Sequence, residues 1–132
     1  MARLIDTHIW IWWLTGSNLL SLKERLALEN EDEPLLLSSI SLWEASLLHE
    51  MERIKLLPNA QAWVKMATSP DLVQVLDLSP EIVSEIFSKK MKTLHKDPAD
   101  RIIVASARAL KIPLHTHDKK IIQSGLVKIW KP

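Results

Sequence analysis

The sequence predicts an α/β fold in which helices cover both faces of a central parallel sheet of four to five strands. Short apolar runs that suit buried strands alternate along the chain with longer segments of helical periodicity. This alternation favours a three-layer α/β/α sandwich with right-handed crossovers. The run Leu35-Leu36-Leu37 is apolar at successive positions, which is typical of a strand covered on both faces.

The first half of the chain begins with a predicted strand over residues 2–6, which ends at Asp6. A helix that is apolar on most sides follows over 7–14, and Gly16 is a candidate stop for it. The remaining elements of this half are an amphipathic helix, a continuous apolar strand and two further helices, expected over 21–30, 34–38, 41–51 and 59–68.

The second half begins with a strand of partly alternating polarity over 71–76. Ser79-Pro80 pairs a capping residue with a proline at the first helical position, which predicts a helix over 80–90. Asp97-Pro98 opens the next helix in the same way. The elements expected from there on are a helix, a strand, a short helical turn stopped by Gly125 and a last strand, over 98–110, 113–116, 118–124 and 127–130.

Composition limits the possible classes of protein. We expect the 132 residues to form a single domain over 1–132, and the net charge of +1 is too small to indicate nucleic-acid binding by itself. The absence of cysteine excludes disulfides, thiolate metal sites and cysteine nucleophiles. No apolar run approaches the ~20 residues that a membrane span requires, and no signal peptide is recognisable. We therefore expect a cytoplasmic protein without a membrane partner.

Acidic residues recur where the predicted strands end or the predicted helices begin. In a parallel sheet crossed by helices these positions share one edge, which is where ligands bind in open α/β folds. The acids expected at this edge are Asp6, Glu44, Asp97, Asp100 and Asp118. Each also has a structural explanation: Ser41 to Glu44 matches a capping box, and the aspartates suit helix N-termini. Asp77 is an acid of the same kind after the strand over 71–76.

The acidic residues predict a function only when they are considered together. Several carboxylates at one edge repel one another, and the crowding raises the pKa of some of them unless a cation neutralises it. A set of oxygen ligands without cysteine suits a hard divalent ion, Mg²⁺ or Mn²⁺. Such an ion activates water and neutralises a phosphate oxygen, so the matching substrate is a phosphodiester.

Four segments carry a family resemblance: LIDTHIWIWWL (4–14), SISLWEAS (39–46), HKDPADRIIVASA (95–107) and LHTHDKKI (114–121). In this order and spacing they resemble the PIN-domain family, and within it the VapC-type ribonuclease toxins of toxin–antitoxin modules. The resemblance implies a PIN-like sandwich with Asp6, Glu44, Asp100 and Asp118 as the catalytic and metal-binding acids. The acid before Arg101 is Asp100, so Asp97 is interpreted as a cap. Thr116 lies where the family often has a hydroxyl near the metal.

The resemblance also implies an activity and partners. The protein would be a Mg²⁺- or Mn²⁺-dependent endoribonuclease that hydrolyses RNA with a metal-activated water, and a small VapB-like antitoxin would neutralise it. Asp6, Asp100 and Asp118 would hold the ion, while Glu44 helps with a second metal or orients the attacking water. A homodimer is implied as well.

Two other functions compete with this interpretation. A non-catalytic PIN-fold module would bind RNA or a protein, and the intact acidic set argues against it. A phosphotransfer receiver domain would need an acceptor near Asp77 and paired acids after the first strand, where Asp6 stands alone.

Histidines and basic residues surround the acids. His115 and His117 would share one face of a strand, but no third histidine or cysteine completes a zinc set, so we expect exposed or hydrogen-bonded imidazoles. A phosphate-binding rim is expected from Lys89, Lys90, Lys92, Lys96, Arg101, Lys119 and Lys120. Most tryptophans are expected in the core, and one or two would line a groove for an antitoxin helix.

Overall fold

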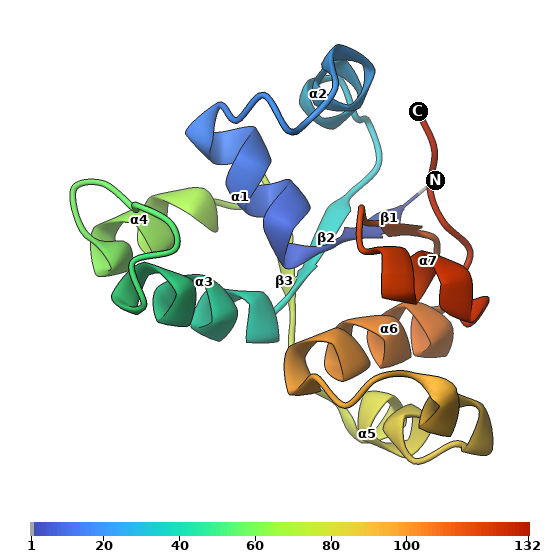
Figure 1. Ribbon diagram of the computed structural model, residues 1–132. Coiled ribbons are helices and arrows are strands. Elements are labelled where there is room, and N and C mark those ends of the chain that lie inside the picture. Colours follow the sequence, from blue (N-terminus) through green and yellow to red (C-terminus); the bar gives the residue numbers. More distant parts are fainter. Residues whose placement is uncertain (1) are drawn as a thin grey trace.

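Four parallel strands form the central sheet of the molecule, whose computed structural model describes residues 2–132. The strands are β1 (Arg3–Ile5), β2 (Leu35–Ser38), β3 (Gln74–Leu76) and β4 (Leu114–His115). Their order across the sheet is β3-β2-β1-β4, so β1 and β2 are the central strands (Figure 1). This confirms the predicted parallel sheet, and the leucine run predicted as a strand forms β2.

The prediction of a full strand over residues 127–130 is wrong. A single parallel bridge joins Leu114 to Ile129. Around it, the Leu114 amide donates to the carbonyl of Lys128 and the Trp130 amide donates to the carbonyl of Leu114, both at 2.8 Å. The ladder stops there because β4 itself has only two residues.

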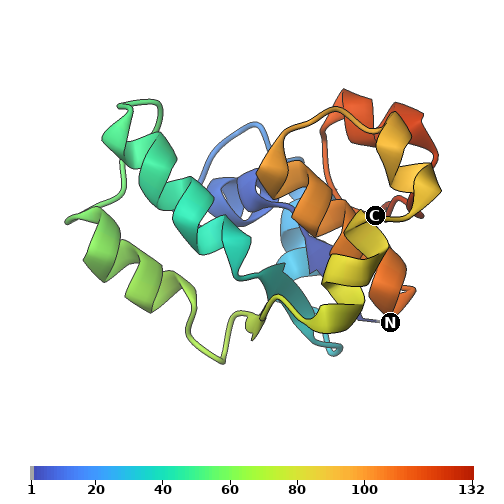
Figure 2. The ribbon, with the colours of Figure 1, turned by 90° about the horizontal axis from the view of Figure 1, so that it is seen from below.

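Helices cover both faces of the sheet, which gives the three layers expected (Figure 2). One face packs against α1 (Thr7–Thr15), α2 (Leu22–Glu29), α3 (Ile40–Glu50) and α4 (Ala60–Ala67). The other packs against α5 (Pro80–Ile86), the 3-10 helix η1 (Lys89–Thr93), α6 (Pro98–Leu110) and α7 (Lys119–Ser124). Within residues 2–132, every helix is too short or too polar to span a bilayer.

The pleat of β1 divides the core in two. Leu4 packs into the cluster under α5, α6 and α7, while its neighbour Ile5 packs into the cluster under α1 to α4. Neither side chain is exposed to solvent. Successive residues of a strand point to opposite faces, so this central strand is apolar at both positions, and it ends at Asp6.

The start of α3 differs from the sequence-based expectation, and the start of α2 has a capping box that was not predicted. The capping box predicted at Ser41 is wrong: α3 begins at Ile40, and the Ser41 hydroxyl lies inside the helix, 2.7 Å from the Thr7 hydroxyl. A capping box is present instead at the start of α2. There the Ser21 hydroxyl accepts from the Glu24 amide at 3.1 Å, and the Glu24 carboxylate accepts from the Ser21 amide at 2.9 Å.

The helix predicted over 80–90 is also shorter than expected. It ends at Ile86, and η1 follows after Ser88. Met91 and Leu94 are both buried and lie three residues apart. A 3-10 helix has three residues per turn, so this local winding turns both side chains toward the core.

Trp10 belongs to the larger core cluster and provides a test of the packing. Its ring is fully buried, its Nε1 donates to the Ala67 carbonyl at 3.0 Å, and its centroid lies 4.9 Å from that of Trp63. We expect Trp10→Ala to lower the free energy of unfolding by about 3–5 kcal/mol, because it leaves a cavity and an unpaired carbonyl.

The matched control is Trp43→Ala, because the Trp43 side chain on α3 is 53% exposed. Its expected cost is about 1 kcal/mol or less. Urea unfolding followed by circular dichroism compares the two variants. Equal losses of stability would contradict this description of the core.

Candidate active site

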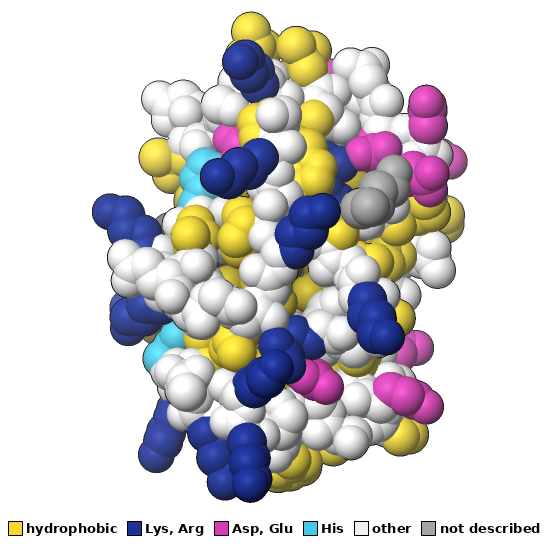
Figure 3. All heavy atoms as spheres, turned by 90° about the vertical axis from the view of Figure 1, so that its right-hand side faces the viewer, with side chains coloured by type: hydrophobic (Ala, Val, Ile, Leu, Met, Phe, Trp, Pro, Cys, Tyr) yellow, Lys and Arg dark blue, Asp and Glu magenta, His cyan; other side chains and the backbone are white. Residues whose placement is uncertain are grey.

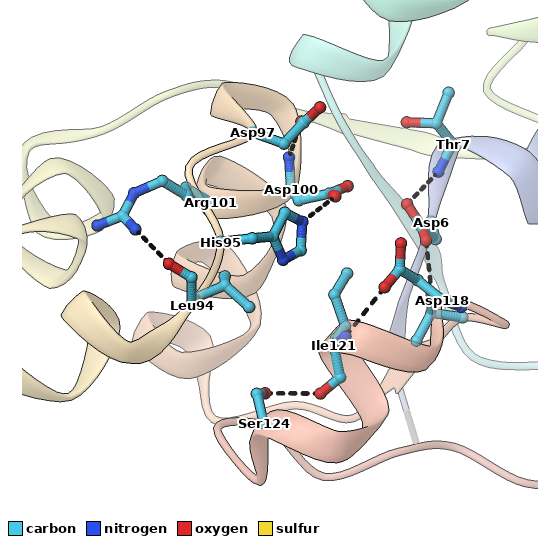
Figure 4. A network of polar contacts seen from close by, with 11 residues as sticks. Asp6, Thr7, Leu94, His95, Asp97, Asp100, Arg101, Asp118, Ile121 and Ser124 are labelled. Carbon is cyan, nitrogen blue, oxygen red and sulfur yellow. Dashed lines mark hydrogen bonds and ion pairs between the residues drawn. The ribbon is translucent and has the colours of Figure 1, made fainter.

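Three aspartates begin helices at the edge of the sheet where the strands end (Figure 4). Asp6 caps α1 directly after β1, Asp97 caps α6, and Asp118 caps α7 shortly after β4. Their carboxylates accept from the amides of Thr7 at 2.8 Å, Asp100 at 3.0 Å and Ile121 at 3.0 Å, respectively. Amides at a helix N-terminus favour a negative charge, so the capping roles predicted for these residues are confirmed.

Asp6 is the most enclosed of the acids. Its side chain is nearly fully buried, and its second oxygen accepts a hydrogen bond of 2.6 Å from the Thr116 hydroxyl. The same hydroxyl accepts from the Asp118 amide at 3.0 Å. Burial raises the pKa of Asp6, the bonds from Thr116 and Thr7 oppose this rise, and the nearby charge of Asp118 adds to it. The Thr116 hydroxyl therefore connects the acid after β1 to the acid after β4.

Asp100 lies in the first turn of α6 and faces the same space as Asp118 and Asp6 (Figure 4). One of its oxygens lies 2.6 Å from His95 Nε2. Burial raises the pKa of Asp100 to about 6. The bond to His95 opposes this rise, and the charges of Asp6, Asp97 and Asp118 reinforce it. The imidazole of His95 is thus hydrogen-bonded to an acid of the site.

Glu44 completes the acidic group from α3. It lies in the second turn of that helix and not in the first turn as predicted, because α3 begins at Ile40. Burial raises the pKa of Glu44 to about 7. A hydrogen bond from Thr7 opposes this rise, and the charges of Asp6, Asp100 and Asp97 add to it. A carboxyl group this perturbed is half protonated near neutral pH.

The donor set fits a hard divalent cation. Oxygens of Glu44, Asp97 and Asp100 lie within 4.8 Å of one another, and Asp100 also forms such a group with Asp118 and His95. Carboxylate oxygens are the ligands that Mg²⁺ and Mn²⁺ prefer. The raised pKa values of Glu44 and Asp100 show that negative charge is unfavourable here without a counter-ion.

A cleft of about 620 Å³ lies between the start of α6 and the start of α7. Acidic and basic residues both line it: His95, Lys96, Asp97, Asp100, Asp118, Lys119 and Lys120. Figure 3 shows lysine and arginine side chains spread over the side of the molecule that includes α7. Three of the lysines in the predicted rim therefore adjoin the acids.

The other residues of the predicted phosphate-binding rim either do not line the cleft or are hydrogen-bonded to backbone carbonyls. Arg101 Nη1 donates to the carbonyls of Met91 and Leu94 at 3.1 and 3.2 Å, so its guanidinium holds the loop before α6. Lys89, Lys90 and Lys92 lie on η1 and do not line the cleft. Asp6 belongs to none of the three groups of neighbouring ligand atoms found in residues 2–132, but its charge acts on Glu44 and Asp100. Asp77 is exposed and also belongs to none of these groups.

One group of polar contacts was not predicted from the sequence. Glu24 on α2 accepts hydrogen bonds from Nε2 of His115 at 2.9 Å and Nε2 of His117 at 2.6 Å. The two histidines share one face as expected and are hydrogen-bonded as expected, but His115 is buried. The pattern of a serine followed three residues later by Glu24 indicates a helix start. It gives no sign of a partner 91 residues away.

Comparison with known proteins agrees with this geometry. The profile of the PIN domain family matches residues 3–125. Ribonuclease VapC22 of Mycobacterium tuberculosis is 30% identical over 118 residues, which are 89% of this chain and 88% of that protein. The DNA-bound VapBC of Salmonella typhimurium has a TM-score of 0.72 at 17% identity, covering 98% of this chain and 97% of that chain.

A toxin–antitoxin complex from Klebsiella pneumoniae has a TM-score of 0.64 at 20% identity, covering 95% of this chain and 94% of that chain. The structural likenesses show a shared fold. The profile match and the sequence identity to VapC22 extend over most of the chain. Together they confirm the resemblance found in the sequence, and the chain belongs to the PIN-domain family.

Proposed function

We propose that this protein is a metal-dependent endoribonuclease, the toxin of a toxin–antitoxin module, built as one PIN domain over residues 1–132. Family membership and a relative named as a ribonuclease support the activity. The observation that carries the proposal is that separate segments bring Asp6, Glu44, Asp100 and Asp118 into one acidic group. Burial and the neighbouring charges raise the pKa of Glu44 to about 7 and of Asp100 to about 6. Perturbed acids in a cleft are typical of catalytic sites.

The proposed cofactor is Mg²⁺ or Mn²⁺, held by Asp6, Asp100 and Asp118. When bound, such an ion lowers the pKa of a water and neutralises charge on a phosphate. Glu44 contributes to a second ion or orients the attacking water, which suits a carboxyl group that exchanges a proton near pH 7.

Neighbouring residues of the chain support these acids. The Thr116 hydroxyl fixes the carboxylate of Asp6, and His95 fixes that of Asp100. Lys96, Lys119 and Lys120 line the cleft and would position the phosphates of an RNA strand. Lysines on both sides of an acidic centre admit an anionic substrate that the acids alone would repel.

The proposed protein partners are a VapB-like antitoxin and a second copy of the chain. The Klebsiella pneumoniae structure of the same fold is a toxin–antitoxin complex. Large apolar side chains are exposed on α2 and before it: Leu19, Leu22 and Leu26 at 61%, 71% and 47%. Exposed apolar residues grouped in this way mark interaction surfaces.

Asp6→Asn tests the activity. We expect the metal-dependent cleavage of RNA to fall about a hundredfold or more and growth inhibition to disappear, because charge stabilisation worth several kcal/mol is lost. The introduced asparagine keeps an oxygen that accepts from the Thr7 amide, so the circular dichroism spectrum should stay unchanged. Cleavage of a labelled RNA with and without Mg²⁺ or Mn²⁺ is the measurement.

The control for this experiment is Asp77→Asn, which removes an exposed acid after β3 and should leave cleavage unchanged. Full activity of the Asp6→Asn variant would refute the assignment. A wild-type protein that binds RNA without cutting it in any divalent metal would favour the non-catalytic binding module.

Glu44→Gln tests the electrostatics of the metal-free protein. Because the pKa of Glu44 rises from 4.5 in the unfolded chain to about 7 in the folded protein, ionisation of this group lowers stability as the pH rises between these two values. Glutamine cannot ionise. We therefore expect the variant to gain stability relative to the wild type across this range, in urea unfolding with a chelator present.

Excess Mg²⁺ should reduce this gain, since a bound cation stabilises the ionised form in the wild type. The matched control is Glu50→Gln, which removes an exposed carboxyl from the same helix. A stability difference between Glu44→Gln and the wild type that is the same at every pH would contradict the raised pKa.

A further inference from the structure

Glu24, His115 and His117 form a second group of potential ligands, outside the acidic group. They come from α2, from β4 and from the segment that follows β4. One ligand atom of each lies within 4.8 Å of the other two. The contacts separate this group from the acids: His115 and His117 bond to Glu24, while the Thr116 hydroxyl bonds to Asp6 and to the Asp118 amide. The nuclease proposal uses none of the three residues.

The surrounding contacts fix the orientation of all three side chains. The Glu24 carboxylate accepts from the Ser21 amide at 2.9 Å in the capping box. The ring of His115 lies against Trp130, with 4.4 Å between centroids, and that of His117 lies against Trp12 at 5.2 Å. Outer contacts of this kind orient metal ligands before the ion arrives.

The charge states of Glu24 and His115 are compatible with a bound cation. Burial raises the pKa of Glu24, but hydrogen bonds from His115, His117 and Ser21 outweigh it and lower the pKa to about 2. Burial lowers the pKa of His115 to about 4, so its ring is neutral at pH 7. The guanidinium of Arg3 also lowers the pKa of His115, and it is paired with Glu31.

We propose that Glu24, His115 and His117 bind a borderline transition-metal ion of the Zn²⁺ class, at a site separate from the acidic centre. Two imidazole nitrogens and one carboxylate oxygen are a ligand set typical of Zn²⁺, whereas Mg²⁺ prefers oxygen alone. Each Nε2 gives up its contact with Glu24 and binds the ion, and the ring proton moves to Nδ1. Nδ1 of His115 has no hydrogen-bond partner within residues 2–132, so this proton shift breaks no contact there.

Access is from the side of His117, whose side chain is 39% exposed, while Glu24 and His115 form the closed side of the site. Three protein ligands leave a fourth position for water. An ion here would join α2 to the segment that carries Thr116 and Asp118.

The test is a titration of the full chain, without a histidine tag, with Zn²⁺ in excess Mg²⁺. We expect about one Zn²⁺ per chain by calorimetry and a higher melting temperature in its presence. His117→Gln and Glu24→Gln should each weaken Zn²⁺ binding about tenfold or more, because loss of a ligand costs at least as much as loss of an outer contact. Both variants are first checked for an unchanged circular dichroism spectrum.

Two controls separate this site from other binding. His8→Gln removes an exposed histidine of α1, and Asp100→Asn removes a ligand of the acidic centre; both should bind Zn²⁺ as the wild type does. Absence of Zn²⁺ binding in the wild type would overturn the proposal. So would binding that survives His117→Gln, or binding that Asp100→Asn abolishes. His117 is exposed, so its variant decides the question even if Glu24→Gln fails to fold.

Discussion

The buried carboxylate of Asp6 is the constraint on which the site depends. It ends the central strand β1 and accepts from the Thr7 amide and the Thr116 hydroxyl, which lies 110 residues away in sequence. A buried charge is costly unless hydrogen bonds or an opposite charge compensate it. Burial outweighs the two bonds here, since the pKa of Asp6 is still raised. The fold thus places Asp6 in an environment where its ionised form is favoured only when a cation lies nearby.

The acids of the site differ in the backbone contacts that their carboxylates make. Asp97 and Asp118 cap helices and accept backbone amides, which offset the cost of their charge. Glu44 and Asp100 cap nothing, and these two acids have pKa values raised to about 7 and 6. Glu44 and Asp100 therefore make the site sensitive to a cation and to pH.

Local signals predicted the parallel sheet and most of the acidic edge. Strand ends and proline-marked helix starts placed Asp6, Asp100 and Asp118 correctly, because these signals lie within a few residues of the acids. The failure at Ser41 has a tertiary cause. The same serine–glutamate spacing occurs at Ser21 and Ser41, and only packing decides between them: the hydroxyl of Ser41 contacts Thr7 on α1 instead of capping its own helix.

The contacts of Glu24 with His115 and His117 could not be predicted from local sequence signals, and the reason is again tertiary packing. Its histidines were recognised as sharing a face, but their partner comes from a helix whose position relative to β4 is set by the whole core. The alternation of residues 115–118 then places this group and the acidic centre on opposite sides of one short segment. A displacement of that segment changes both sets of ligand positions together. If ions occupy both sites, linkage requires that each change the affinity for the other by the same factor.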